Sequence, residues 1–228
     1  MERPMQTKSI WKVIDRLTTV AILVVAVALG WKLLRPKNGP IEPPPPKLET
    51  TSISDAARIG SPRAPLAMII YSDFECPFCG QFARDVWPQI QREFVDTGKI
   101  LVAFKNFPLS IHQNAFRAAE VAECARRQDK FWPVHDAIFA GGVRLERDSI
   151  LRDASRLVPD PVGLEGCLGE TTRLKIQNEL TAAMSIGLRK TPSFAIGRVH
   201  LDDKVQPRVI LEGLLEFDKL ASVLDSVK

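Results

Sequence analysis

The stretch Tyr71-Ser72-Asp73-Phe74-Glu75-Cys76-Pro77-Phe78-Cys79 decides the fold of this chain. It follows the apolar run 66–71, which predicts a buried strand, and precedes the amphipathic run 81–94, which predicts a helix. Two cysteines three residues apart at a helix start have the spacing of a pair that closes and opens a disulfide. If Cys76 is the N-cap, Pro77 takes the first helical position, where its missing N–H costs nothing. The sulfur of Cys76 then faces unpaired N–H groups and the positive end of the helix dipole, which predicts a lowered pKa and a nucleophile.

The cysteines also allow two other interpretations. Zinc ligation would combine Cys76 and Cys79 with Cys124 and Cys167, but structural zinc sites usually bring paired ligands on tight turns, and the last two cysteines stand alone. A purely structural Cys76–Cys79 disulfide would remove little chain entropy, because the loop it closes is so short. The spacing therefore favours a redox pair.

An apolar segment near the N-terminus predicts a membrane anchor. The chain has 228 residues, enough for one globular domain and an appendage, and the run Leu17–Trp31 carries no charge. Trp11 and Trp31 are twenty residues apart, about 30 Å along a helix, which matches the hydrocarbon thickness of a bilayer. A cleaved signal peptide is the alternative, since Ala26-Val27-Ala28 resembles a cleavage site. We expect residues 1–35 to form a cytoplasmic N-terminus and a single transmembrane helix.

The residues after this segment predict a spacer and then one domain. Residues 36–46 are rich in proline and predict an extended polyproline spacer, so we assign 36–53 to a linker and 54–228 to the domain. Lysine and arginine lie on both sides of the span, so they do not fix its orientation. An oxidising cysteine pair belongs outside the cytosol, which places the domain on the extracytoplasmic side. Residues 47–228 carry 24 Lys/Arg and 24 Asp/Glu, so the domain has no basic surface of the kind that nucleic acid requires.

The remaining pattern predicts an α/β domain with a block of helices inside it. A strand at 66–72, a helix at 77–94 and a strand at 100–104 make a βαβ unit with parallel strands. The later segments have helical or strand periodicity. We expect helices at 113–127, 131–139, 149–157 and 168–186, breaks at 141–142 and around 159–166, a hairpin of 193–196 and 209–211 with a long loop at 197–208, and a last helix at 216–226.

Four stretches together resemble one family. Besides the stretch that ends in Cys79, they are His112-Gln113-Asn114-Ala115, Lys130-Phe131-Trp132-Pro133-Val134-His135-Asp136 and Thr191-Pro192-Ser193-Phe194. In this order they resemble the DsbA-like thiol:disulfide oxidoreductases over most of residues 64–226. The resemblance implies a thioredoxin-like fold with an inserted helical subdomain at about 111–187.

The resemblance also implies roles for individual residues. Cys76 and Cys79 would be the catalytic pair, and Thr191, Pro192 and Phe78 would bind substrate, with Pro192 in the cis conformation. A second, structural disulfide would join Cys124 and Cys167, although two buried free thiols remain the alternative. No metal or other cofactor is implied.

The implied partners are exported proteins that contain cysteines, and a quinone-linked membrane reoxidase or an electron donor. The implied location is the bacterial cytoplasmic (inner) membrane, with the domain on the periplasmic side and no contact with nucleic acid. We expect the protein to introduce disulfides. A reductase or isomerase of the same fold, or a chaperone-like peptide-binding module without catalysis, remains open.

The sequence departs from the family at one position. Members commonly carry a buried glutamate six residues before the first cysteine, where this chain has Ile70, so the proton of Cys79 would use water or another group. Asp73 is interpreted as a turn residue, and Glu75 would oppose thiolate formation at Cys76. Because Phe78 is neither cationic nor a hydrogen-bond donor, the pair should be less oxidising than the extreme members of the family.

The sequence predicts no catalytic role for the three histidines. His112 and His135 have no partner at ligand spacing and match helical landmarks of the insertion, so we interpret them as structural or capping residues. His200 is expected to be solvated in the hairpin loop.

Overall fold

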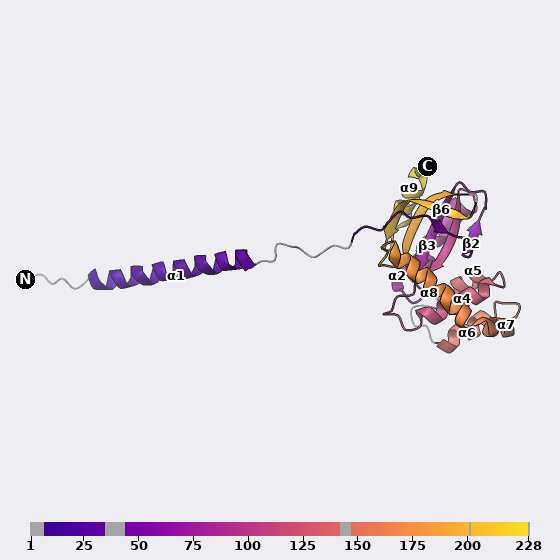
Figure 1. Ribbon diagram of the computed structural model, residues 1–228, viewed down its shortest axis with the longest axis horizontal. Helices are drawn as coiled ribbons and strands as arrows, with labels where there is room; N and C mark the ends of the chain where they lie inside the picture. The colour runs from indigo at the N-terminus through magenta and orange to yellow at the C-terminus, as the bar shows by residue number, and fades with distance from the viewer. Residues whose placement is uncertain (1–6, 35–43, 142–146, 201, 228) are drawn as a thin grey trace, which may run out of the picture. The chain divides into compact units, whose positions relative to one another are not determined.

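The computed structural model describes residues 7–34, 44–141, 147–200 and 202–227, and the chain divides into two compact units, Met1–Pro44 and Pro45–Lys228. In the first unit, helix α1 spans Thr7–Leu34 (Figure 1). Its part Arg16–Leu34 is long and apolar enough to cross a membrane, and a signal sequence has the same properties. The Trp11 side chain and the spacer residues 35–43 lie outside the described part of the chain.

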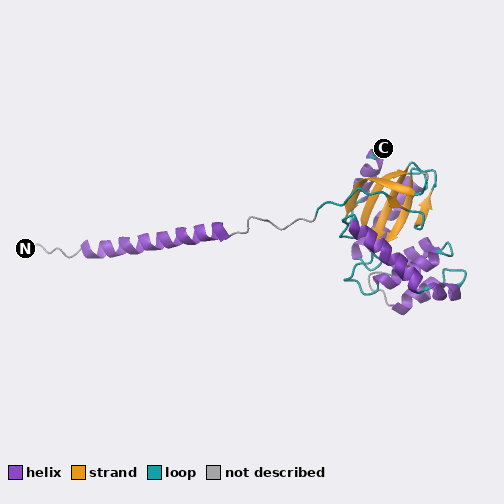
Figure 2. Ribbon diagram, in the orientation of Figure 1, coloured by secondary structure: helices purple, strands orange, loops and turns teal. Residues whose placement is uncertain are grey.

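The second unit is built on one mixed sheet with helices around it (Figure 2). The parallel pair at its centre confirms the predicted βαβ unit. From edge to edge the strands are β1 (Thr51–Ser52), β6 (Lys204–Glu212), β5 (Ser193–Val199), β3 (Leu66–Ser72), β4 (Ile100–Asn106) and β2 (Ala57–Gly60).

Strands β3 and β4 are apolar on both faces because each face is covered. On β3, Met68 and Ile70 pack with the helix that follows the cysteines and with α9 (Phe217–Ser226), while Ile69 and Tyr71 belong to a second cluster that includes residues near the end of α8 (Glu170–Ser185). A strand buried on both faces has a continuous apolar pattern rather than an alternating one. This is why residues 66–72 and 100–104 were predictable as strands.

The helix predicted at 77–94 forms as one run of consecutive helical segments, and these segments are of two types. It consists of α2 (Pro77–Gln81), a π-helical segment Phe82–Val86, α3 (Trp87–Ile90) and a second π-helical segment Gln91–Val95. The N–H of Trp87 bonds the carbonyl of Phe82, five residues back. Pro88 has no N–H to give to the carbonyl four residues earlier and would clash with it, so a wider turn before the proline accommodates the ring.

Among the described residues between β4 and β5, five helices form the insertion: α4 (Ala115–Arg126), α5 (Phe131–Ala140), α6 (Arg147–Ser155), α7 (Pro161–Cys167) and α8. Helix α7 overturns the break predicted around 159–166. Asp160 is its N-cap and accepts a bond from the Gly163 N–H at 2.9 Å, and Pro161 stands at the helix start. A proline and a glycine that signal a break are here the first turn of a short helix.

The prediction of a long hairpin loop at 197–208 is also wrong. Strand β5 continues to Val199, and strand β6 already starts at Lys204. A register shift between Ile196 and Gly197 breaks the alternation that would have revealed the longer strands. The two edge strands β1 and β2 were not predicted. The folded unit also includes residues before 54, since the Lys47 N–H bonds the Ile186 carbonyl at 2.6 Å.

Candidate active site

Cys76 lies at the start of α2, where the chain turns from the end of β3 into the helix. It is the N-cap residue with extended backbone angles, and Pro77 follows in the first turn, as predicted. The Gly80 N–H bonds the Cys76 carbonyl at 3.0 Å, which closes the first turn. Cys76 and Cys79 are free thiols, so the structure represents the reduced pair.

The two thiols have opposite pKa shifts. The pKa of Cys76 is lowered to about 6, first by a hydrogen bond from the Cys79 thiol and then by Thr191 and by the N–H groups of Cys79 and Phe78. Burial raises the pKa of Cys79, and the neighbouring charge of Cys76 raises it further. When the pair carries one negative charge, that charge therefore resides on the Cys76 sulfur, as the place of Cys76 at the helix start predicts.

A loop from the far end of the insertion forms the wall opposite Cys76. The Thr191–Pro192 peptide bond is cis, and the Cys76 thiol donates to the Thr191 carbonyl at 3.4 Å. Phe78 projects outward from the cysteine loop with 56% of its surface exposed. The structure thus brings together Cys76, Thr191 and Pro192 from positions more than a hundred residues apart.

Position 70 supplies no carboxylate near Cys79, because the residue there is Ile70. Ile70 is buried in the apolar cluster between the sheet and the helices. The Asp73 N–H donates to the Cys79 sulfur at 3.5 Å, and the Ser72 hydroxyl and this N–H both lower the pKa of Cys79 against the rise that burial causes. Ser72, at the end of β3, is a functional candidate that the sequence interpretation missed, because nothing in its local pattern distinguishes it from a strand-end serine.

Asp73 is a turn residue, as interpreted, and it also fixes a second loop. Its carboxylate is buried and accepts bonds from the Glu75 N–H at 2.8 Å, the Leu109 N–H at 2.8 Å and the His112 ring at 2.7 Å. Burying a carboxylate is unfavourable unless it is hydrogen-bonded in this way. The pairing of Asp73 with His112 explains His112 as a structural residue, and only the fold brings the two together.

Glu75 is directed toward the same loop. Its carboxylate accepts the Asn114 N–H at 2.6 Å, just before α4 begins. The expected opposition to the Cys76 thiolate is therefore offset, because the negative charge is engaged by a backbone donor.

His135 lies in an aromatic cluster beneath the cysteine loop and is not a ligand. It is buried, its Nδ1 is 2.8 Å from Asp136 Oδ1, and burial lowers its pKa. Its ring packs at 5–6 Å between centroids against Phe74, Phe104, Phe131, Trp132 and Phe139. His200 is exposed at the hairpin turn.

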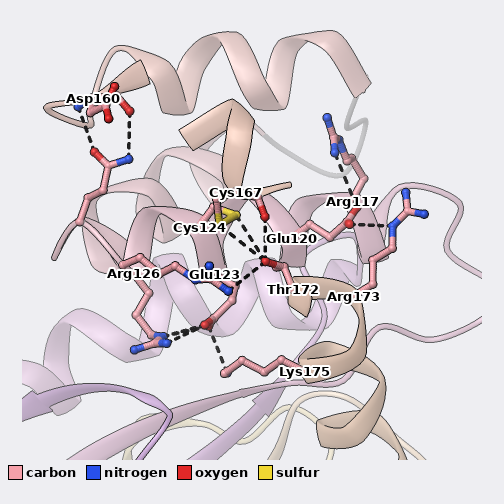
Figure 3. Close-up of a disulfide and its surroundings, with 12 residues drawn as sticks. Arg117, Glu120, Glu123, Cys124, Arg126, Asp160, Cys167, Thr172, Arg173 and Lys175 are labelled. Carbon is pink, nitrogen blue, oxygen red and sulfur yellow. Dashed lines mark hydrogen bonds and ion pairs between the residues drawn. A yellow bond between two sulfur atoms is a disulfide. The ribbon is translucent and has the colours of Figure 1, made fainter. Parts of the chain in front are cut away.

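The other two cysteines form a disulfide between α4 and α7. Cys124 and Cys167 are bonded with a sequence separation of 43, and Cys124 is buried. The Thr172 hydroxyl lies against both sulfurs and donates to the Cys167 carbonyl at 2.9 Å (Figure 3). This bond is incompatible with zinc held by all four cysteines, and among the described residues no group of three or more His, Cys, Asp or Glu is placed to hold a metal ion.

In the same region, basic side chains of α8 and of α4 itself form ion pairs with the buried acids of α4 (Figure 3). Glu123 bonds Arg126 at 2.7 Å and Lys175 at 3.1 Å, and Glu120 bonds Arg173 at 2.9 Å. Together with the disulfide, these pairs link α4 to α7 and α8.

Comparison with known proteins places this architecture in a family. A family model described as Thioredoxin matches residues 52–214. The structure of Wolbachia pipientis α-DsbA1 superposes with a TM-score of 0.63 and 26% identity, covering 76% of this chain and 91% of that one.

Sequence relatives come from two kinds of protein. The Na(+)/H(+) antiporter NhaA 3 of Salinispora tropica is 33% identical over 150 residues, which are 64% of this chain and 22% of the antiporter, so the chain spans about a fifth of that relative. Disulfide bond formation protein D of Bacillus subtilis is 21% identical over 185 residues, covering 76% of this chain and 78% of that protein. The family model covers more than half of the chain and the fold superposes on that of α-DsbA1, so the chain belongs to the thioredoxin family and has a DsbA-like fold.

Proposed function

We propose that this protein is a membrane-tethered extracytoplasmic thiol:disulfide oxidoreductase that introduces disulfides into exported proteins. Cys76 and Cys79 are its catalytic residues, and Thr191, Pro192 and Phe78 bind the substrate. The observation that carries the proposal is the asymmetry of the two thiols: the pKa of Cys76 is lowered to about 6, and that of the buried Cys79 is raised.

The reaction begins with the oxidised pair. A client thiolate attacks the Cys76 sulfur, the Cys76–Cys79 bond breaks, and Cys79 leaves as a thiolate that takes up a proton. The client's second thiolate then attacks its own sulfur in the mixed disulfide and releases Cys76 as a thiolate. Two electrons have passed from the client to the pair. The release step is favourable because helix-start N–H groups and the Cys79 thiol stabilise the Cys76 thiolate.

Proton uptake by Cys79 uses Ser72 and water in place of the family's glutamate. The Ser72 hydroxyl bonds the Cys79 sulfur, and a hydroxyl both donates and accepts. It therefore stabilises the leaving thiolate and relays a proton to it, giving its own proton to Cys79 while it takes one from water.

The first unit of the chain supports the proposed location. Helix α1 carries the apolar segment Arg16–Leu34, which we assign as an uncleaved anchor in the cytoplasmic membrane. Residues 36–53 connect it to the domain on the periplasmic side. A quinone-linked reoxidase in the same membrane returns the pair to the disulfide state.

The test is a trapping experiment in cells. The variant Cys79→Ala leaves Cys76 without its resolving partner, so mixed disulfides with exported proteins and with the reoxidase should accumulate and disappear on reduction. The variant Cys76→Ala, which lacks the attacking sulfur, is the matched control and should trap nothing. The redox state of the wild-type pair decides direction: a mainly oxidised pair agrees with the proposal, and a mainly reduced pair contradicts it in favour of a reductase or isomerase.

A further inference from the structure

The peptide group that joins Ser72 to Asp73 is hydrogen-bonded at both of its ends. Its N–H, on Asp73, donates to the Cys79 sulfur at 3.5 Å. Its carbonyl, on Ser72, accepts the N–H of Phe107 at 2.8 Å. A hydrogen bond to the carbonyl of an amide polarises the group and strengthens the bond that its N–H donates. The loop that follows β4, residues 107–114, therefore begins by supporting a donor that faces Cys79.

Further bonds along this loop hold it against the turn before the cysteines. The Asp73 carboxylate is fully buried, accepts the Leu109 N–H at 2.8 Å and lies 2.7 Å from the ring nitrogen Nδ1 of His112. Because a carboxylate only accepts, that ring nitrogen carries the hydrogen. At the end of the loop, the Asn114 N–H donates to the Glu75 carboxylate at 2.6 Å. The position of the turn is thus fixed by side chains that are not themselves part of the cysteine loop.

Negative charge develops on the Cys79 sulfur when the oxidised pair reacts. A client thiolate bonds to the Cys76 sulfur, the Cys76–Cys79 bond breaks, and its electron pair goes to Cys79, which then takes up a proton. Because Cys79 is buried and burial raises its pKa, charge on its sulfur is unfavourable unless donors face it. A donor that is already in place needs no reorganisation when the charge appears. The Asp73 N–H has this arrangement.

We propose that Asp73 is a positioning residue of the exchange reaction: its buried carboxylate, held by the loop after β4, fixes the direction in which its own N–H faces the Cys79 sulfur. The inference rests on the proposed function and adds a residue that acts on the leaving sulfur. The Cys76 thiolate is stabilised by other groups, which are the Cys79 thiol, Thr191 and the N–H groups of the helix start. Loss of the Asp73 carboxylate should therefore affect Cys79 much more than Cys76.

The test measures how fast dithiothreitol reduces the oxidised full chain in detergent, with acid quenching and maleimide labelling of the free thiols. Asp73→Ala should slow the reduction about tenfold, because a hydrogen bond to a charged sulfur is weakened. Asp73→Asn should stay within about threefold of the wild type, since the amide oxygen can accept the bonds from Leu109 and His112. In the reduced protein, alkylation of Cys76 by iodoacetamide should change by less than about twofold in both variants.

Glu123→Gln is the matched control for a loss of stability. Glu123 is also a buried carboxylate, with a side chain that is 1% exposed, but it bonds Arg126 and Lys175 in the insertion. Its replacement should lower the free energy of unfolding in urea, as Asp73→Ala should, and leave the rate of reduction unchanged. If Asp73→Ala does not fold, His112→Ala removes only one of the bonds to the carboxylate and should slow the reduction about threefold.

The outcomes separate the inference from the proposed function. Equal slowing in Asp73→Ala and Glu123→Gln would overturn the inference, because lost stability alone would explain both rates. Slowing of reduction and of Cys76 alkylation by the same factor in Asp73→Ala would also overturn it, since the effect would not be specific to the leaving sulfur, and so would a wild-type rate in that variant. A wild-type pair that dithiothreitol fails to reduce would instead contradict the proposed function itself.

Discussion

The two cysteine pairs of this domain differ in environment more than in chemistry. Cys76 and Cys79 are three residues apart at a helix start and are free thiols, whereas Cys124 and Cys167 are 43 residues apart and bonded between two helices. The first pair is surrounded by donors that stabilise a thiolate on one sulfur. The second has Thr172 against both sulfurs and closes a long loop. A helix terminus and a neighbouring loop therefore make a cysteine reactive, whereas the length of the loop that it closes makes a disulfide stabilising.

The largest expected effect is on the free energy of unfolding, and we expect it when the Cys124–Cys167 pair is removed but not when the Cys76–Cys79 pair is. Replacing Cys124 and Cys167 by alanine should lower the free energy of unfolding by about 4 kcal/mol, because the bond closes a loop of 43 residues in the unfolded chain. Urea unfolding of the full chain in detergent, followed by tryptophan fluorescence, measures it.

The matched variant Cys76→Ser, Cys79→Ser should show the reverse pattern. It should abolish thiol:disulfide exchange with a dithiol peptide and change the unfolding free energy much less. If both double variants lost stability equally, the division of roles between the pairs would be wrong.

The second effect is the pH dependence of the reactive thiol. Because the folded pKa of Cys76 is about 6 and an unperturbed thiol has a pKa of about 8.5, alkylation of reduced protein by iodoacetamide should rise about tenfold per pH unit up to about 6 and then level off. A folded protein whose profile has its midpoint near that of the urea-unfolded chain would contradict this prediction.

The lowered pKa of Cys76 also determines how the stability of the reduced form depends on pH. A folded pKa below the unfolded value means that the thiolate contributes to the stability of the reduced form in full above the unfolded pKa, and that this contribution is lost as the pH falls through about 6. The reduced form should therefore become less stable relative to the oxidised form below neutral pH.

The smallest effect concerns the residue between the cysteines. The Cys76 pKa lies between those of thioredoxin (about 7) and DsbA (about 3.5), so the reduction potential should lie between about −270 and −120 mV. Phe78→His should make it less negative by about 30 mV for each unit by which it lowers the Cys76 pKa. Equilibration with glutathione buffers measures both proteins. A wild-type potential near −120 mV would show that an aromatic residue at this position does not limit oxidising strength.

The local parts of the site could be predicted from the sequence. The helix start at Cys76, the buried strands before and after it, and the turn role of Asp73 are each set by a few adjacent residues. What brings Thr191 to Cys76 is the fold of the whole chain, so it was accessible through family resemblance and not through local pattern.

The missed features share a physical cause. Strands β1 and β2 are too short to show a period, helix α7 is hidden by residues that normally signal a break, and the bulge at Gly197 interrupts alternation. The contacts of Asp73 with His112 and of Ser72 with Cys79 depend on side-chain directions. Sequence periodicity describes which face of an element is buried, but not which polar groups meet across elements.

The short edge strands have a consequence for a protein that handles unfolded chains. An exposed strand edge offers unpaired N–H and C=O groups on which another extended chain can form a ladder. Here the outer strands β1 and β2 have two and four residues, and β6 contains Pro207, which cannot donate to a ladder. Under the proposed function, a client finds only short backbone ladders at these two outer strands, so its attachment would be made at Cys76, where it is covalent and reversible.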